Sequence, residues 1–448
     1  MKKVLALVLS LVLCLSFFAG CSSDSSSTAP VSTPDSESES VAPAEPVTLT
    51  VVTTFGGSDG NRGTYEKAIA DYQAASGNTI DDQSGTADET FKTKIATDFS
   101  TGAEPDVMFY IFSEMADQIA AGQFVDLDTI KAVYPDYASN MDAASMPNVV
   151  SADGKNYAVP AYGYWEGLYY NTTVLDAAGV KAPGDDYTWD QFLADCEAIK
   201  AAGYVPVALS LTGEPHYWFE YCVMNNAGPQ DKHTVVPAAK DDQGYKNWAA
   251  GVNDIKALYD AGYCPDNALT LQTAEHAQMI ADGAAAFDID GSWKLQWYVD
   301  NANIEEIGLG YPPAKEARKA TDVVGGVSSG WMITKKCWDD PKKQAAAVEF
   351  VSFMTENDRL GEFATKANSI TYLKDGFNAP DASDLSPAQI KAAGFLGGAS
   401  TVTPATQDGI TSAIREKLFT QDIAAVCAGT MTAEEAIDGL LERVADAA

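Results

Sequence analysis

The sequence predicts an α/β protein, because strand-like and helix-like segments alternate along most of the chain. Residues 47–52 alternate polar and apolar side chains like a strand, and 65–72 carry apolar residues at helical spacing. The helical segment 188–200 is in turn followed by a strand-like run at 205–211. Alternation of this kind is typical of sheets covered by helices.

Helix starts are marked by capping residues at several places. Asp88 precedes a segment with apolar residues on one helical face, and Pro341 suits the first turn of another helix. Thr188 and Thr432 are each followed three residues later by Gln or Glu, which is the spacing of a capping box. These positions predict four helix N-termini.

Composition narrows the class of function. The chain has 448 residues, of which 46% are hydrophobic, so it is long enough to bury cores for two or three domains. Its net charge of −34 would repel phosphate backbones, and we therefore expect no nucleic-acid partner. Acidity of this size favours solubility but does not define a fold.

The cysteines and histidines form no recognisable metal-binding motif. Of seven cysteines, Cys14 and Cys21 lie in the N-terminal segment, and the other five are widely spaced. We expect these five to be small buried hydrophobic residues, with one disulfide among them as the alternative. The three histidines show no H-E-x-x-H pattern, so the sequence predicts no metal site and no cofactor. The five cysteines are Cys196, Cys222, Cys264, Cys337 and Cys427.

Residues 1–21 form a targeting segment. Two lysines are followed by the apolar run 4–18 and by Ala-Gly-Cys at 19–21. This ending resembles a bacterial lipobox, although Phe18 stands where a small aliphatic residue such as Leu is usual. The resemblance implies that Cys21 becomes a lipidated first residue. An uncleaved anchor is the alternative, and both place the body outside the cell.

Residues 22–46 predict a disordered tether. The segment is rich in Ser, Pro, Asp and Glu and has no aromatic residue, so it cannot bury apolar area. A flexible chain of this length spans roughly 25–30 Å. We therefore expect a leash that holds the folded body, which begins at Val47, off a membrane. Its length favours a Gram-positive cell surface.

An aromatic stretch at 155–171 is the part around which we expect the chain to be organised. Pro160 interrupts a short strand-like run, and four large aromatic residues follow within eight positions. Glycines among them suit a bent crossing segment that presents flat rings to open space. A buried aromatic hairpin is the alternative, and the stretch alone does not separate the two. The four aromatic residues are Tyr162, Tyr164, Trp165 and Tyr169.

Two later runs join small residues to a tryptophan. Residues 284–293 resemble a small-residue strand that ends in Asp290, a glycine, a serine and Trp293. Ligands of open α/β sheets lie beyond the carboxyl ends of strands, so Trp293 is a candidate stacking face and Asp290 a candidate acceptor for hydroxyl groups. A tight turn with a core tryptophan is the alternative. A similar run lies at 325–333.

These segments, in this order, resemble the extracellular solute-binding proteins of ABC importers, specifically the sugar-binding group related to maltose-binding protein. Each segment alone is weak evidence for this family, whereas the whole set in this order is specific for it. The similarity spans the chain from about residue 47 to the end, and the lipobox and tether agree with it independently. The residues that carry it are 102–107 (GAEPDV), 155–160 (KNYAVP), 168–171 (LYYN), 187–192 (YTWDQF), 291–293 (GSW) and 345–350 (AAAVEF).

The resemblance implies a two-lobe, type II periplasmic-binding-protein-like fold with a ligand cleft between the lobes. By this analogy the first lobe comprises residues 47–160 and 294–353. The second lobe comprises residues 161–290 and 357–448. Both lobes would therefore use discontinuous stretches of the chain.

The same analogy implies three crossings between the lobes. The aromatic stretch 155–171 would be the first crossing. Residues 290–293 would be the second and residues 354–358 the third. Aromatic faces at such crossings would suit closure of the lobes on a ligand.

The resemblance also implies capture of a sugar or oligosaccharide by lobe closure and its delivery to an ABC-transporter permease. Aromatic faces would stack on sugar rings, and carboxylates would accept hydrogen bonds from the sugar hydroxyl groups. No cofactor and no catalysis are needed, and we expect a monomer. For Trp218, a helix start that packs on the core is the favoured alternative. The candidate ligand-binding residues are Asp59, Glu114, Tyr162, Tyr164, Trp165, Glu166, Trp218, Asp290, Trp293, Ser329 and Trp331.

Two other functions stay open. A surface glycoside hydrolase needs two carboxylates that flank a bond, and with 63 acidic residues such pairs carry no information. A binding protein for a peptide or polyamine is the other alternative, since acids and aromatic faces together also hold cations. The scarcity of histidine argues against a metal trap, and the aromatic residues favour sugar.

Overall fold

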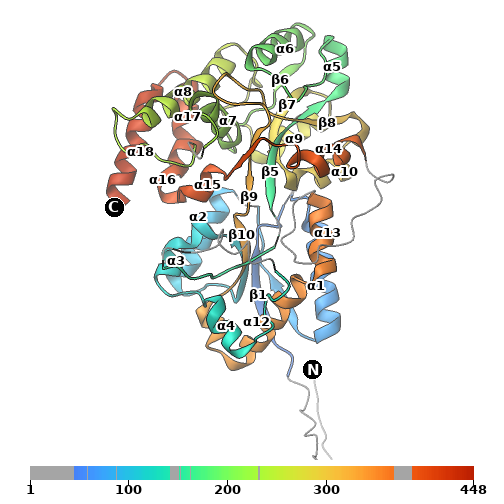
Figure 1. The fold of residues 1–448 in the computed structure, drawn as a ribbon, viewed down its shortest axis with the longest axis vertical. Helices are drawn as coiled ribbons and strands as arrows, with labels where there is room; N and C mark the ends of the chain where they lie inside the picture. Colours follow the sequence, from blue (N-terminus) through green and yellow to red (C-terminus); the bar gives the residue numbers. More distant parts are fainter. Residues whose placement is uncertain are drawn as a thin grey trace, which may run out of the picture. The chain divides into compact units, whose positions relative to one another are not determined.

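Two separate β-sheets organise the protein (Figure 1). The targeting segment, nearly all of the expected tether and Tyr162 lie outside the described residues. The computed structural model describes residues 45–57, 59–86, 88–141, 151, 153–161, 163–230, 233–367 and 386–447.

The first sheet contains five strands: β1 (Thr48–Thr53), β2 (Thr79–Asp82), β3 (Val107–Ile111), β4 (Val159–Pro160) and β10 (Ser329–Ile333). Their order across the sheet is β2-β1-β3-β10-β4. β1 runs parallel to β2 and β3, whereas β10 runs antiparallel to β3 and β4. The sheet is therefore mixed, and a late segment of the chain completes it.

Helices cover both faces of the first sheet because its strands are apolar on both sides. Val107 and Phe109 of β3 enter one core, and Met108 and Tyr110 enter the core on the opposite face. The helices are α1 (Arg62–Ser76), α2 (Glu89–Thr101), α3 (Ala116–Ala120), α4 (Leu127–Val133), α11 (Lys335–Trp338), α12 (Pro341–Met354) and α13 (Asn357–Ala367).

The second sheet contains six strands: β5 (Tyr164–Asn171), β6 (Val205–Val207), β7 (Ala285–Gly291), β8 (Ile307–Gly310), β9 (Asp322–Gly326) and β11 (Thr401–Thr403). The main order is β11-β9-β5-β7-β6, and β8 also pairs with β5. β5 is the longest of these strands, and all of its residues are buried. It is antiparallel to its three neighbours β7, β8 and β9.

The helices around the second sheet come from the middle and the end of the chain (Figure 1). Leu168 and Tyr170 of β5 enter one core, whereas Trp165 and Tyr169 enter the other. The helices are α5 (Thr172–Ala178), α6 (Trp189–Ala201), α7 (His216–Ala227), α8 (Gln243–Asp260), α9 (Thr273–Ala281), α10 (Leu295–Asn301), α14 (Pro387–Phe395), α15 (Thr406–Gly409), α16 (Ser412–Lys417), α17 (Ile423–Cys427) and α18 (Ala433–Ala447).

Strand pairing corrects the second predicted crossing. Both β8 and β9 pair with β5, so they belong to the second sheet and not to the first lobe. The chain passes to the first sheet at 327–328, between β9 and β10, and not at 290–293. The prediction was wrong because it took a ligand-site motif for a boundary, whereas backbone pairing decides which sheet a strand joins.

The third predicted crossing is also wrong. Leu360 and Phe363 of α13 pack in the same core as α12, so no crossing lies at 354–358. We use "first lobe" for the described residues of 46–160 and 329–367, and "second lobe" for those of 164–326 and 386–447. The first passage between the lobes occurs between β4 and β5.

Local predictions of helix starts are confirmed. The Asp88 carboxylate accepts the Phe91 N–H at 2.8 Å, and Thr188 forms a capping box with Gln191. The Thr432 and Glu435 side chains each accept the other's backbone N–H. The five cysteines of the described region are buried free thiols, as small hydrophobic residues would be.

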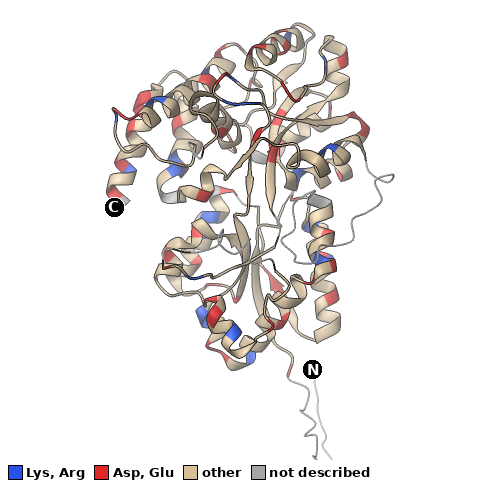
Figure 2. Ribbon diagram, viewed as in Figure 1, with Lys and Arg blue, Asp and Glu red and all other residues tan. Residues whose placement is uncertain are grey.

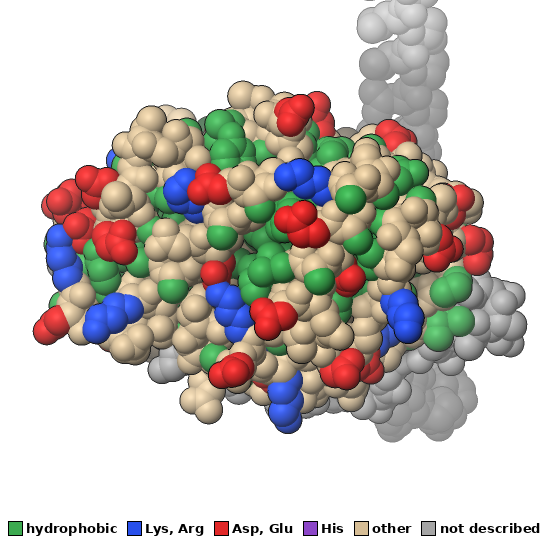
Figure 3. Space-filling model, turned by 90° about the horizontal axis from the view of Figure 1, so that it is seen from above, with side chains coloured by type: hydrophobic (Ala, Val, Ile, Leu, Met, Phe, Trp, Pro, Cys, Tyr) green, Lys and Arg blue, Asp and Glu red, His purple; other side chains and the backbone are tan. Residues whose placement is uncertain are grey.

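Charged residues are spread over both lobes (Figure 2). On the face shown in Figure 3, acidic and basic side chains are interspersed with apolar ones, and the basic residues form no single patch. Among the described helices, none is both long enough and apolar enough to cross a membrane.

We expect Trp331→Ala to lower the free energy of unfolding by about 3–5 kcal/mol, the usual cost of truncating a buried tryptophan. The Trp331 ring is only 2% exposed and lies 5.3 Å from the ring of Phe109 and 5.5 Å from that of Phe350. Urea unfolding followed by circular dichroism measures the change. A loss below about 1 kcal/mol would contradict this core placement.

Candidate functional site

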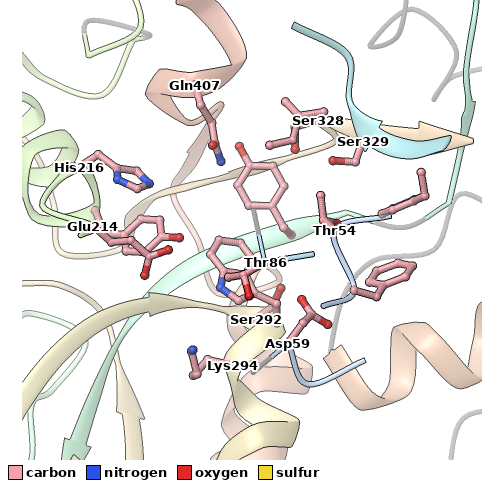
Figure 4. Close-up of a pocket in the computed structure, with 16 residues that line it drawn as sticks. Thr54, Asp59, Thr86, Glu214, His216, Ser292, Lys294, Ser328, Ser329 and Gln407 are labelled. Carbon is pink, nitrogen blue, oxygen red and sulfur yellow. The ribbon is translucent and has the colours of Figure 1, made fainter. Parts of the chain in front are cut away.

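A cavity between the lobes forms the candidate ligand-binding site (Figure 4). It measures about 130 Å³. A cavity of roughly 150 Å³ holds a benzene molecule, so this one suits about a single ring. The first lobe and the passage into it contribute Thr54, Phe55, Asp59, Thr86, Phe109, Ile111, Ser328 and Ser329. The second lobe contributes Tyr164, Glu214, His216, Tyr217, Ser292, Trp293, Lys294 and Gln407.

Three aromatic rings of the second lobe form one wall of this cavity, which we call the aromatic wall. The Trp293 ring centre lies 6.0 Å from that of Tyr164 and 5.8 Å from that of Tyr217. Both tyrosine side chains are almost fully buried, whereas Trp293 keeps part of its ring exposed. The tyrosines therefore support a tryptophan face that a ligand can reach.

Gly291 makes room for the Trp293 ring. A Cβ atom at this last residue of β7 would lie 2.2 Å from the ring, closer than any real contact. The Trp293 carbonyl in turn accepts the Gly60 N–H from the first lobe at 3.1 Å. The absence of a side chain at Gly291 thus leaves room for the ring against its own strand, while the Trp293 backbone contacts the opposite lobe.

Asp59 places a carboxyl group at the first-lobe side of the cavity. It follows β1 in a glycine-rich loop and accepts the Asn61 N–H at 2.7 Å. Burial raises the pKa of Asp59 to about 7, although the Asn61 N–H and the Lys294 ammonium lower it. Near neutral pH this group can therefore either donate or accept a hydrogen bond.

An ion-pair chain behind the cavity holds Glu214 in place. The His276 Nδ1–H donates to Asp288 at 2.7 Å, and its Nε2–H donates to Glu214 at 3.2 Å. Burial lowers the pKa of His276, but the Asp288 and Glu214 carboxylates outweigh it and raise the pKa to about 10. The imidazolium charge stabilises both carboxylates, and Glu214 is presented at the cavity wall.

Lys294 brings a positive charge to the same wall. Its ammonium lies 3.7 Å from Asp290 and over the Trp297 ring at 5.7 Å, and the residue is only 5% exposed. Burial raises the pKa of Asp290 to about 6, although Lys294 and His276 lower it. Asp290 lies behind Lys294 and has an oxygen without a hydrogen-bond partner among the described residues.

The ligand atoms of His276, Asp288 and Asp290 lie within 4.8 Å of one another, close enough for a metal site. Both ring nitrogens of His276 already donate to carboxylates, however, and a protonated imidazole offers no lone pair to a metal. We therefore assign the three residues to the ion-pair chain.

Four of the predicted site residues line the cavity: Asp59, Tyr164, Trp293 and Ser329. They come from four separate segments of the chain, and the fold brings them together. Tyr162 lies outside the described residues. Asp290 does not line the cavity, but it forms an ion pair with Lys294, which does.

The structure corrects the predicted ligand-binding roles of Trp165 and Trp331, and for Trp218 it agrees with the favoured alternative of packing on the core. All three rings are at most 2% exposed and belong to the hydrophobic cores. Trp165 lies 4.5 Å from the ring of Phe395, on the face of β5 opposite Tyr164. Neighbouring residues of a strand face opposite sides, so only one of two adjacent aromatic residues reaches the cavity.

Glu114 and Glu166 do not line the cavity either. Glu114 forms an ion pair with Arg415 of the second lobe. Glu166 is fully buried, and neither of its carboxyl oxygens has a hydrogen-bond partner among the described residues. Burial and the nearby Glu220 carboxylate raise the pKa of Glu166 well above its usual range, which favours the neutral form of this carboxyl group.

Sequence reasoning missed several residues of the cavity. Glu214 lies just before α7, and His216 and Tyr217 are its first two residues, directly before Trp218. Helix starts near a sheet edge are common ligand positions, and this was the available signal. Thr54, Thr86, Lys294 and Gln407 carried no local pattern that marked them.

The cavity lies between the two lobes, next to the passages between β4 and β5 and between β9 and β10. The model of the family described as "Bacterial extracellular solute-binding protein" matches residues 57–359. The chain belongs to this family. No curated protein sequence matches it.

Solved structures with the same fold cover about nine-tenths of the chain. A chitin oligosaccharide binding protein is 22% identical, with a TM-score of 0.76 over 90% of this chain and 99% of its own. The bacterial solute receptor AcbH, with a preference for β-D-galactopyranose, is 14% identical, with a TM-score of 0.73 over 90% of this chain and 100% of its own. Maltose-bound MalE3 of T. maritima is 18% identical, with a TM-score of 0.70 over 90% of this chain and 100% of its own. The chain thus has the two-lobe type II periplasmic-binding-protein-like fold.

We expect Gly291→Ala to displace the Trp293 ring, because the new Cβ and the ring cannot occupy the same space. Incorporation of 5-fluorotryptophan and ¹⁹F NMR would show a shifted Trp293 resonance, assigned with Trp293→Phe. Gly63→Ala is the matched control, since a Cβ there meets nothing within 4 Å. An unchanged resonance in Gly291→Ala would refute the steric argument.

The His276 ion pairs predict a pH dependence of stability. The folded pKa of about 10 exceeds the ordinary 6.5, so the stabilisation is complete below pH 6.5 and is lost as pH rises toward 10. His276→Gln should remove most of this decline. Thermal unfolding of both proteins between pH 6 and about 10 measures it. Parallel curves for the two proteins would contradict the assignment.

Proposed function

We propose that the protein captures a sugar between its lobes, with about one ring enclosed in the cavity. The observation that carries the proposal is the aromatic wall of Tyr164, Tyr217 and Trp293, with polar groups from both lobes around it. Sugar rings have apolar C–H faces and hydroxyl edges, which match an aromatic face surrounded by hydrogen-bonding groups.

The polar groups of the cavity suit hydroxyl recognition. Glu214 is a fixed acceptor, Lys294 is a fixed donor, and Asp59 can act as either near neutral pH. Charge-assisted hydrogen bonds to such groups are shorter and stronger than neutral ones. Because both lobes contribute, ligand binding and lobe closure support each other.

The structural neighbours support sugar over the other solutes considered. Those named above bind chitin oligosaccharide, β-D-galactopyranose and maltose. The GacH receptor of Streptomyces glaucescens, with 18% identity and a TM-score of 0.69, was solved with acarbose.

The proposed role is binding without catalysis. Residues 326–330, GVSSG, fit the G-x-S-x-G pattern of serine hydrolases. A nucleophile elbow joins a strand to a helix, whereas this segment joins β9 to β10. Family members and the neighbours named above are receptors, which supports the same conclusion.

We further propose that Cys21 carries the lipid anchor and that residues 22–46 tether a monomeric receptor to the outer face of a cell membrane. The receptor would deliver its sugar to the permease of an ABC importer. The lipobox-like sequence, the composition of the tether and the membership of an extracellular family support this arrangement.

A sugar that binds should stabilise the protein in a thermal-shift screen of mono- and oligosaccharides. At about 100 times its dissociation constant, it should add roughly 2.7 kcal/mol to the free energy of unfolding. Trp293→Ala should then weaken binding by about 2 kcal/mol or more, near 30-fold, in isothermal titration calorimetry.

Trp338→Ala is the matched control. This tryptophan of α11 is 8% exposed and packs against Tyr134 in the first lobe, and it does not line the cavity. Equal losses of affinity in the two variants would argue against the aromatic wall. No stabilisation by any sugar, or release of a cleaved product, would refute the proposed function.

A further inference from the structure

A buried ion pair joins the two lobes outside the cavity. Glu114 belongs to the 3₁₀ turn Phe112–Met115 after β3, and Arg415 belongs to α16. Their side chains are only 5% and 1% exposed. The two residues are 301 positions apart in the sequence, so only the fold brings them together.

A second contact beside this pair reaches the cavity. The Ser113 hydroxyl donates to the Gln407 carbonyl at 2.5 Å, and the Lys92 ammonium lies 3.5 Å from the Gln407 side-chain oxygen. The Gln407 side chain lines the cavity (Figure 4). The first lobe therefore holds a cavity residue of the second lobe from both its backbone and its side chain.

The ion pair depends on how the lobes are arranged. When the lobes are together, both charges are removed from water and each compensates the other. Apart from Glu114, Arg415 donates to the Ile410 carbonyl at 3.1 Å, within its own lobe. If Glu114 lost its charge, the closed arrangement would lose this ion pair while Arg415 stayed buried, whereas water would solvate the arginine in an open arrangement. Removal of either charge should therefore favour separation of the lobes.

We propose that Glu114 and Arg415 are positioning residues for ligand capture, which stabilise the closed arrangement of the lobes without touching the ligand. The proposal deepens the function proposed above and rests on it for its biological meaning. It assigns Glu114 a different role from the hydroxyl acceptor that the sequence suggested.

A distance measurement without ligand tests the proposal. Spin labels on p-acetylphenylalanine at positions 133 and 390, one per lobe, leave the native cysteines unlabelled. Both positions are well exposed, at 56% and 53%, and lie on helices. Double electron–electron resonance on the full chain then reports the spread of inter-lobe distances.

We expect the wild-type protein to populate a short distance between the two labels, which reports the closed arrangement. Glu114→Gln should move most of that population to a longer distance. Arg415→Lys should do the same in part, since lysine keeps the charge but not the fork of donors. Lys315→Met is the matched control, because it breaks the 2.5 Å Lys315–Asp254 pair within the second lobe. That variant should lose stability and keep the wild-type distances.

A wild-type protein without the short distance would overturn the proposal. So would an unchanged distribution in both Glu114→Gln and Arg415→Lys. Because no ligand is present, neither result depends on whether sugars bind. If a sugar is found, Glu114→Gln should also raise its dissociation constant about tenfold, mainly through faster release. Unchanged affinity in that variant would show that the pair has no part in capture.

Discussion

The site depends on one constraint: adjacent residues of a strand face opposite sides of their sheet. At the start of β5, Tyr164 reaches the cavity, and Trp165 next to it enters the core. On β7, Asp288 and Asp290 face the same side and meet His276 and Lys294. The register of two central strands thus decides which ring and which charges a ligand can contact.

Charge compensation beneath the cavity is the second requirement of the site. A buried carboxylate is costly unless a cation accompanies it, and here His276 and Lys294 accompany three carboxylates. Such ion pairs add little net stability, but they hold their members in one orientation. Glu214 and Lys294 are therefore in place before a ligand arrives, which lowers the entropy lost on binding.

Local patterns predicted the α/β class and individual helix starts because both depend on neighbours in sequence. Asp88 and Thr188 needed only the next turn of the chain to act as caps. Site residues were predicted where a strand end or a glycine-rich loop marked them, as with Trp293 and Asp59. No sequence pattern marked Lys294, since its place in the site depends on its ion pair with Asp290 and on its proximity to Asp59 of the opposite lobe.

The order of segments also could not reveal where the chain changes sheets. That choice depends on hydrogen bonds between β5 and the distant strands β8 and β9. The fully buried tryptophans show the same limit. An aromatic residue in a strand is compatible with a core or a cleft, and only the packing of Trp331 against Phe109 and Phe350 distinguishes them.

Ser328 and Ser329 give the cavity a mechanical property. They lie where the chain passes from β9 to β10, and Tyr164 directly follows the passage between β4 and β5. In the proposed lobe closure, a ligand there would lie close to the segments about which one lobe turns against the other. Displacement in a rotation grows with distance from its axis, so a small adjustment around the ligand becomes a much larger movement at the rims. A ligand in the cavity would therefore move little, while the outer edges of the lobes would move furthest.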